Sequence, residues 1–210
     1  MNIAIIIQAR LGSTRLPGKI LLPFYGNQTI MDILLEKMHQ ATDLKVVVAT
    51  TTSPANNTLA NYLRSKGELV YRGSENDVLN RFIKTAEKYH VDGIVRICSD
   101  NPFIDPEGIK TLFEKAQHSK ADYIGFRINN LPSIKTHFGF WGEFVTLKTL
   151  KKVALTTNDL AAHEHVTIHV YSHPETYHCE WIDCPDFIQG RDDIRLTVDT
   201  REDFETAQKA

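Results

Sequence analysis

The chain has 210 residues, of which 42% are hydrophobic and 24% are charged, and its formal net charge is −2. This length and composition predict one folded domain with a sizeable core. The near-neutral charge argues against a nucleic-acid-binding protein, whose surface is usually basic, and no apolar stretch approaches the length of a membrane span.

The first part of the chain alternates between predicted strands and helices. Residues 3–7 are a continuous apolar run, mostly β-branched, which is typical of a strand covered on both faces. Thr29 with Asp32 resembles a capping box and predicts a helix to about Gln40. The other expected strands are 45–50, 68–71, 93–98 and 121–126, and the other helices are 55–65, 74–89 capped by Ser74, and one opened by Asp105 and Pro106. This order predicts an α/β protein with a mostly parallel, twisted sheet and helices on both faces.

The alternation weakens after about Asn129. Residues 165–171 and 177–182 resemble extended segments joined by a turn at 172–174, which predicts a hairpin. We therefore expect one domain over 1–210 with a β-rich insertion at about 130–185. Residues 195–198 predict a last strand, and Thr200 with Asp203 predicts the cap of a last helix.

A cationic loop follows the first predicted strand. Arg10, Arg15 and Lys19 are its cations, and no acidic residue precedes Asp32. Glycines let backbone N–H groups approach phosphate oxygens, and cations offset the charge of a polyphosphate. The loop therefore indicates a polyphosphate site, with an ordinary solvated surface loop as the alternative.

The two best-known phosphate loops do not match this segment. Walker A loops place four residues between their glycines, followed by Lys and Ser or Thr. Here five residues separate Gly12 from Gly18, and Ile20 follows Lys19. The G-x-G-x-x-G pattern is absent as well, so a P-loop ATPase and a dehydrogenase lose their main support.

Two aspartates follow predicted strands that are far apart in the chain. Asp100 comes after the strand at 93–98, and Asp199 comes after the strand at 195–198. Ligands of open α/β sheets bind outside the carboxyl ends of the strands, and Mg²⁺ commonly takes one or two carboxylates plus phosphate oxygens. The pair predicts a metal and triphosphate site, and two unrelated turn carboxylates are the alternative.

Four motifs together carry a resemblance to a known family. They are QARLGSTRLPGK at 8–19, RGSENDVLNRF at 72–82, SDNPFIDP at 99–106 and RLTVDTREDFE at 195–205. In this order they resemble the cytidylyltransferase family, which includes synthetases of CMP-activated ulosonic acids and, as the more similar group, cytidylyltransferases of spore-coat polysaccharide biosynthesis.

The resemblance implies a Rossmann-like nucleotide-diphospho-sugar transferase fold and a homodimer. It also implies transfer of CMP from CTP to an acidic sugar of the ulosonic type, with release of pyrophosphate, for surface polysaccharide biosynthesis. The implied cofactor is Mg²⁺.

The resemblance also assigns expected roles to individual residues. Arg10, Lys19 and Asp100 are the implied catalytic residues, and Asp100 with Asp199 would hold the metal. The implied nucleotide-binding residues are Ala9, Arg10, Gly12, Ser13, Arg15, Lys19, Arg72 and Ser99. Glu164, His165 and Asn101 would contact the acceptor, although Asn101 stands where some members carry an acidic residue.

Five of the nine histidines lie between His163 and His178. On an extended strand, residues 163, 165, 169 and 173 would share one face. This pattern leaves two interpretations, a transition-metal site or a polar strand face that contacts another subunit.

Two alternatives to the cytidylyltransferase interpretation stay open. One is a nucleotidyltransferase with another base or acceptor, and the other is a nucleotide-binding protein without catalysis. The three cysteines, Cys98, Cys179 and Cys184, are an odd number and predict free thiols in a reducing cytoplasm.

Overall fold

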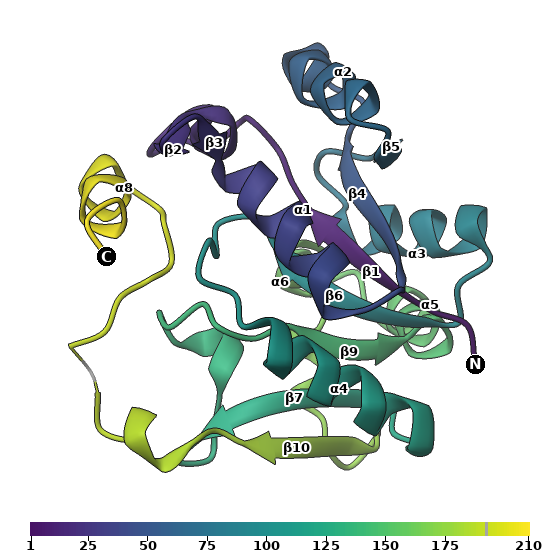
Figure 1. Cartoon of the computed structure of the whole chain (residues 1–210). Helices are drawn as coiled ribbons and strands as arrows, with labels where there is room; N and C mark the ends of the chain where they lie inside the picture. The colour runs from purple at the N-terminus through teal and green to yellow at the C-terminus, as the bar shows by residue number, and fades with distance from the viewer. Residues whose placement is uncertain (192) are drawn as a thin grey trace.

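A twisted eight-stranded sheet forms the centre of the molecule (Figure 1). The computed structural model describes residues 1–191 and 193–210. Along the sheet the order is β10-β7-β9-β6-β1-β4-β5, with β8 paired to β7. Adjacent strands run parallel except where β9 lies antiparallel between β6 and β7, and where β8 meets β7. The strands are β1 (Ile3–Gln8), β4 (Lys45–Thr51), β5 (Leu69–Gly73), β6 (Gly93–Cys98), β7 (Tyr123–Ile128), β8 (Leu131–Pro132), β9 (Glu143–Thr146) and β10 (Cys179–Asp183).

Helices cover both faces of the sheet, as predicted. Alternate side chains of a strand point to opposite faces, so Ile5 and Ile7 of β1 join one core cluster, whereas Ala4 and Ile6 join the other. The first cluster includes α1 (Ile30–Ala41), α2 (Asn57–Ser65) and α4 (Pro106–His118). The second includes α3 (Val78–Tyr89), α5 (Leu147–Thr156), α6 (Leu160–His165) and α7 (Ile168–Tyr171). Figure 1 shows α1 and α4 in front of the sheet and α3, α5 and α6 behind it.

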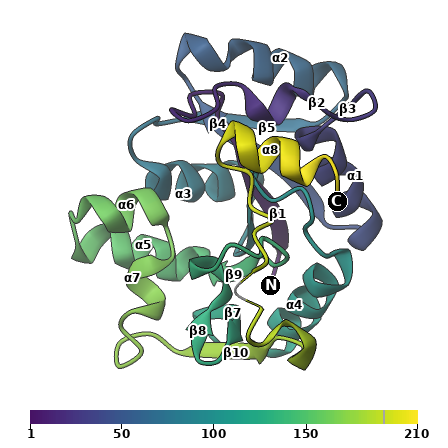
Figure 2. The same ribbon diagram turned by 90° about the vertical axis from the view of Figure 1, so that its left-hand side faces the viewer.

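The last helix, α8 (Arg201–Ala207), packs beside the hairpin of β2 (Pro23–Tyr25) and β3 (Gln28–Thr29) (Figure 2). The rings of Phe204 and Phe24 meet edge to face with centroids 5.2 Å apart. Gln208 donates side-chain hydrogen bonds to the carbonyl oxygens of Pro23 and Phe24. The N-terminal and C-terminal parts of the chain are therefore in direct contact. Short 3-10 turns complete the structure at Lys19–Leu21, Pro54–Asn56, Ser133–Lys135 and Asp186–Ile188.

The helix caps agree with the sequence except at one position. Thr29 with Asp32 and Thr200 with Asp203 each form a capping box, and Asp105 caps α4. The expected cap Ser74 is wrong, because Asp77 caps α3 by accepting a hydrogen bond from the Asn80 N–H. Ser74 instead accepts one from the Asp77 N–H and belongs to the preceding turn.

The segment 130–185 is not β-rich, and the expected hairpin does not form. Helices α5, α6 and α7 supply most of its regular structure, and β10 pairs in parallel with β7. Ala162, Val166 and Val170 are spaced four residues apart and are fully buried. Ala162 and Val170 come from the separate helices α6 and α7 and pack together with Val166 in the second cluster. This tertiary packing overrides the strand preference of the β-branched residues.

Residues 195–198 also differ from the prediction, because they form no strand. Leu196 and Thr197 donate their N–H groups to the His137 carbonyl oxygen, and Val198 donates to that of Asp100. The segment therefore obtains its hydrogen bonds from loops instead of a neighbouring strand. Across residues 1–191 and 193–210, no helix combines the length and apolar character needed to cross a bilayer.

Candidate active site

The cationic loop after β1 is closed by its own hydrogen bonds. The Leu11 N–H donates to the Asn56 side-chain oxygen at 2.7 Å, and the Gly18 N–H donates to the Leu11 carbonyl at 3.0 Å. Gly18 has a φ of 71°, in the left-handed region that glycine adopts without steric cost. This turn feeds the chain into the buried 3-10 turn and leaves Lys19 only 8% exposed.

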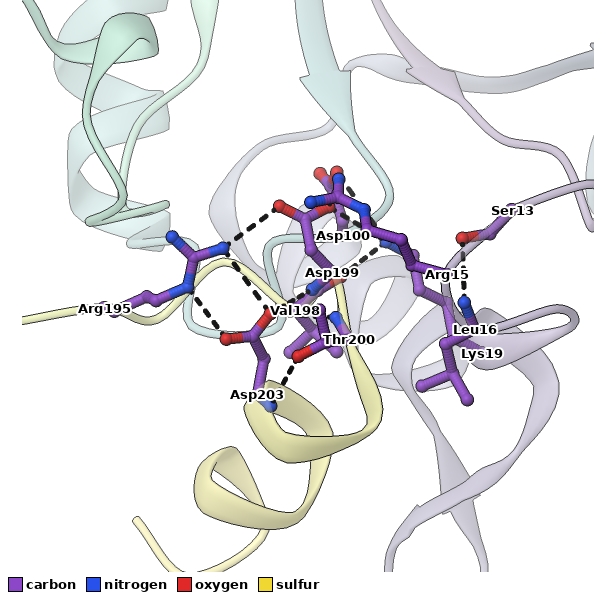
Figure 3. A network of polar contacts seen from close by, with 10 residues as sticks. All are labelled: Ser13, Arg15, Leu16, Lys19, Asp100, Arg195, Val198, Asp199, Thr200 and Asp203. Carbon is purple, nitrogen blue, oxygen red and sulfur yellow. Dashed lines mark hydrogen bonds and ion pairs between the residues drawn. The ribbon is translucent and has the colours of Figure 1, made fainter.

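Lys19, Asp100 and Asp199 converge at one point (Figure 3). The Lys19 ammonium lies 3.5 Å from Oδ1 of Asp199 and 4.0 Å from Oδ2 of Asp100, and it donates a hydrogen bond to the Val198 carbonyl. Asp100 follows β6, and Asp199 follows the irregular segment that is bonded to the Asp100 backbone. The structure therefore brings together three residues that the sequence placed on one candidate site.

Two further cations neutralise Asp199. An Arg15 nitrogen lies 2.9 Å from Oδ1 and an Arg195 nitrogen lies 3.4 Å from Oδ2. Asp100 has fewer partners: burial raises the pKa of its carboxyl, the Lys19 charge lowers it, and the Asp199 charge raises it again. The site therefore holds two close carboxylates whose mutual repulsion a cation would relieve.

Two cavities, each of about 340 Å³, meet at these carboxylates. The loop cavity is lined by Arg10, Ser13, Arg15, Lys19, Ser99 and Glu164, among others. The inner cavity lies against the segment 133–141 and is lined by Asn101, Lys135, His137, Gly139 and Thr197, among others. Both cavities share Arg96, Cys98, Asp100, His165 and Asp199. Asp100 and Asp199 are therefore accessible from two separate compartments.

Three predicted nucleotide-binding residues do not line either cavity. Ala9 is buried, and its N–H donates to the Ala49 carbonyl, whereas Gly12 is exposed next to Glu75. Arg72 donates from its guanidinium to the carbonyl oxygens of Thr51 and Ser53 at 2.8 Å and 3.0 Å. In this structure Arg72 stabilises the loop after β4 through these two hydrogen bonds.

The histidines do not share a strand face, so that premise is wrong. His163 pairs with Asp77 at 2.9 Å, while the rings of His169 and His173 lie 4.2 Å apart. Among these five histidines, His165 lines both the loop cavity and the inner cavity, and the other four line neither. In the part of the chain that the structure describes, no three His, Cys, Asp or Glu side chains are grouped for metal binding.

His165 reaches the cavities through a constrained backbone. Val166, which ends α6, has a φ of 58°, an unusual value for a β-branched residue. The next residue, Thr167, donates its hydroxyl to the Glu143 carboxylate at 3.0 Å. Strain of this kind persists where surrounding contacts determine the conformation, and here the contacts are the buried side chains of Val166 and Thr167.

Sequence reasoning missed the buried ion pair between Arg96 and Glu143. Glu143 also accepts a hydrogen bond from the Tyr123 hydroxyl at 2.6 Å, and Arg96 donates to the Gln8 side chain at 3.3 Å. Burial raises the pKa of the Tyr123 hydroxyl, which therefore stays a donor. A charged residue inside the apolar run of β6 was the available signal for Arg96, whereas its partner lies on a strand that the sequence did not predict.

Two polar groups beside the inner cavity lack partners. Among residues 1–191 and 193–210, neither Oδ1 of Asn101 nor Oγ1 of Thr197 has a hydrogen-bond partner. A side chain at Gly139 would place its Cβ 2.9 Å from that Asn101 oxygen and 3.2 Å from the Thr197 methyl carbon. Unpartnered buried polar groups cost about 1–3 kcal/mol each, so this wall suits a ligand that supplies hydrogen bonds.

The comparison with known families agrees with this geometry. A family model described as "Cytidylyltransferase" matches residues 4–210. The chain belongs to the cytidylyltransferase family. It is therefore a nucleotidyltransferase, and its sheet and helices have the Rossmann-like nucleotide-sugar transferase fold.

Individual proteins resemble the chain over nearly its whole length. The "Spore coat polysaccharide biosynthesis protein SpsF" of Bacillus subtilis (strain 168) is 34% identical over 211 residues, covering 98% of this chain and 84% of that protein. A solved cytidylyltransferase from Leptospira borgpetersenii is 31% identical with a TM-score of 0.87, covering 99% of this chain and 85% of that one. A CMP:2-keto-3-deoxy-manno-octonic acid synthetase complexed with CTP shares the fold, with a TM-score of 0.74 at 15% identity over 100% of this chain and 98% of that one.

The two carboxylates of this cytidylyltransferase fit a hard divalent cation. Asp100 and Asp199 both lie within 4.0 Å of the same Lys19 nitrogen, so their oxygens face a common point. A cation such as Mg²⁺ needs only one or two protein carboxylates when a substrate supplies phosphate oxygens. The donor set is therefore sufficient together with a triphosphate.

Proposed function

We propose that the protein transfers CMP from CTP to an acidic sugar and releases pyrophosphate. The observation that carries this proposal is the convergence of Lys19, Asp100 and Asp199 where the two cavities meet. A transferase of this kind needs a donor and an acceptor on opposite sides of one reacting phosphorus. The chain is proposed to act as one nucleotidyltransferase domain over residues 1–210.

The loop cavity is the proposed CTP site. Arg10, Arg15 and Lys19 line it together with Ser13 and Ser99. Arg10 and Lys19 would stabilise the charge that develops on the leaving pyrophosphate, because fixed cations stabilise a transition state without reorganising. Arg15 is 59% exposed in its side chain and comes from a loop, so it is placed to exchange its Asp199 partner for a phosphate.

Asp100 and Asp199 are the proposed ligands of Mg²⁺. The bound ion would offset phosphate charge and lower the pKa of the attacking sugar hydroxyl. Lys19 lies beside both carboxylates and would keep them from repelling each other while the substrates assemble.

The inner cavity is the proposed acceptor site. Asn101 and Thr197 offer hydrogen bonds to sugar hydroxyls, since the described residues leave both of them unsatisfied. The Lys135 ammonium nitrogen lies 5.3 Å from the centroid of the Tyr171 ring. Among the ion pairs of the described residues, none includes Lys135. A cation in that position suits a sugar carboxylate. His165 and Glu164 complete the proposed contacts at the boundary with the loop cavity.

The segment 130–185 is proposed to contribute a homodimer contact as well. Leu155 and Leu160, which belong to α5 and α6, are 88% and 83% exposed. Contiguous exposed apolar patches mark interaction surfaces, and we propose that Leu155 and Leu160 belong to one. We also propose a cytoplasmic location and a role in surface polysaccharide biosynthesis, in keeping with the similarity to the Bacillus protein.

A pyrophosphate-release assay tests the proposed reaction. The purified protein is incubated with Mg²⁺, one nucleoside triphosphate and a panel of ulosonic and nonulosonic acids. We expect release only with CTP and one class of acidic sugar, and the Asp100→Asn variant should lose most of it. Release with UTP or GTP would point to another nucleotidyltransferase, and CTP binding without turnover on any sugar would point to a non-catalytic protein.

A further inference from the structure

Cationic side chains contact the Asp199 carboxylate on two sides (Figure 3). Its Oδ1 faces Arg15 at 2.9 Å and Lys19 at 3.5 Å, on the side of the loop cavity. Its Oδ2 faces Arg195 at 3.4 Å. The two oxygens are therefore inequivalent, with one directed at the substrate loop and the other at the C-terminal segment.

Arg195 is itself fixed by Asp203. The Arg195 Nε–H donates to Oδ1 of Asp203 at 2.8 Å, and an Nη2–H of the same guanidinium approaches Oδ2 at 3.5 Å. Such a fork holds the guanidinium plane in one orientation. Neither Arg195 nor Asp203 lines the loop cavity or the inner cavity, so both act on the site only through Asp199.

Asp203 is anchored in turn by the start of α8. Its Oδ2 accepts hydrogen bonds from the backbone N–H groups of Asp199 at 3.0 Å and Thr200 at 2.8 Å. The same side chain completes the capping box of that helix. The Asp203 carboxylate thus binds both the backbone N–H of Asp199 and the Arg195 guanidinium that faces the Asp199 carboxylate.

Arg15 and Arg195 differ in what a triphosphate would do to them. Arg15 belongs to the cationic loop and lines the loop cavity, so phosphate oxygens compete with Asp199 for it. Arg195 lies outside both cavities and keeps its Asp203 partner. Nucleotide binding would therefore take Arg15 away from Oδ1 of Asp199 and leave Oδ2 held by Arg195.

We propose that Arg195 is a positioning residue that holds Oδ2 of Asp199, so that Oδ1 alone is presented to the divalent cation where the two cavities meet. This inference rests on the proposed metal role of Asp199. Groups that orient a metal ligand change metal affinity by about 10- to 100-fold when they are removed. The expected effect of losing Arg195 therefore lies in the affinity for the ion, with CTP binding in the absence of metal unchanged.

Manganese titration followed by electron paramagnetic resonance measures this directly, with Mn²⁺ as the probe and CTP present at saturation. We expect Arg195→Gln to raise the Mn²⁺ dissociation constant by about 10- to 100-fold. Arg195→Lys keeps the charge but lacks the guanidinium that contacts both oxygens of Asp203. Its Mn²⁺ dissociation constant should lie between those of the wild type and Arg195→Gln. The matched control is Arg201→Gln, because Arg201 starts the same helix and pairs only with the exposed Glu205, at 3.9 Å, among the described ion pairs. Its constant should stay within about twofold of the wild type.

The outcomes separate this inference from the proposed function. Wild-type protein that binds CTP but no Mn²⁺ would overturn the metal role of Asp199 and the positioning role with it. Wild-type protein that binds both, together with an Arg195→Gln variant of equal Mn²⁺ affinity, would overturn only the role of Arg195. A thermal unfolding midpoint for each variant shows that it is folded, and Arg195→Lys provides the same test if Arg195→Gln does not fold.

Discussion

Lys19 donates a hydrogen bond to the carbonyl oxygen of Val198, which lies 179 residues further along the chain. The contact joins the end of the cationic loop to the residue that precedes Asp199. Because Lys19 is only 8% exposed, its ammonium needs such partners to offset the cost of leaving water.

Replacing Lys19 should reduce catalysis strongly. We expect Lys19→Ala to lower turnover by about 10²- to 10³-fold, as for the loss of other preorganised groups that stabilise developing charge. Pyrophosphate release at saturating CTP and sugar measures the effect. Lys110→Ala, at an exposed lysine of α4, is the control and should match the wild type. Near-normal turnover of Lys19→Ala would contradict the assignment of this residue.

Adding one carbon at Gly139 should affect the acceptor selectively. The new Cβ would lie 2.9 Å from Oδ1 of Asn101, and the φ of 67° disfavours any side chain. We expect Gly139→Ala to raise the KM for the sugar about tenfold or more while leaving CTP affinity unchanged, since the loop cavity does not include Gly139. Gly190→Ala is a suitable control, because Gly190 also has a positive φ, whereas none of the described residues would lie within 4 Å of an added Cβ. An unchanged KM for the sugar would argue against the inner cavity as the acceptor site.

Breaking the ion pair of Arg96 with Glu143 should destabilise the fold. Glu143→Ala leaves a buried guanidinium without its partner and removes the acceptor of Tyr123 and Thr167. Such losses cost about 3–5 kcal/mol, which equilibrium unfolding in urea measures. The surface variant Glu87→Ala, which removes a partner of Lys84 and Lys151, should leave the midpoint almost unchanged. Equal midpoints for the two variants would show that the buried pair contributes no special stability.

His163 should make stability depend on pH. Its hydrogen bond with Asp77 raises the pKa of the imidazole, burial lowers it less, and a bond to the Thr157 carbonyl raises it further. Because the folded state binds the His163 proton more tightly than the unfolded state, protonation of His163 stabilises the fold. This stabilisation is complete below the ordinary histidine pKa of about 6.5, and it disappears as the pH rises through the raised pKa of the folded state.

Thermal midpoints of the wild type and His163→Gln, measured between about pH 5.5 and 8.5, check this sign. The wild type should be the more stable protein at the acidic end, and the difference should shrink toward the alkaline end. His118→Gln, at an exposed histidine, should show no such trend. A difference that grows with pH would refute the pairing of His163 with Asp77 as its cause.

Local patterns were sufficient to predict the strands β1, β4, β5, β6 and β7 and part of the site. The apolar run of β1 reflects burial on both faces, and the capping boxes at Thr29 and Thr200 depend on residues only three apart. Asp100 could be placed because it follows a strand whose carboxyl end faces the loop after β1. In a parallel sheet, strand direction alone brings such loops together.

Contacts between distant segments explain what the sequence did not show. The antiparallel strand β9 contains four residues and depends on β6 and β7 for its register. The resemblance implied that Arg72 binds nucleotide, yet its guanidinium donates to the carbonyl oxygens of Thr51 and Ser53. Arg195 likewise acquires its place only when α8 positions Asp203. None of these partners is encoded in a local spacing.

Asp199 belongs to an irregular segment that follows every strand of the sheet in chain order. Val198, which precedes it, and Phe204 and Ala207 of α8 belong to the same core cluster as the side chains of β1 and β6. The packing of the core therefore holds this carboxylate in place. A change that loosens α8 from the cluster would displace Asp199 and leave Asp100 at the end of β6.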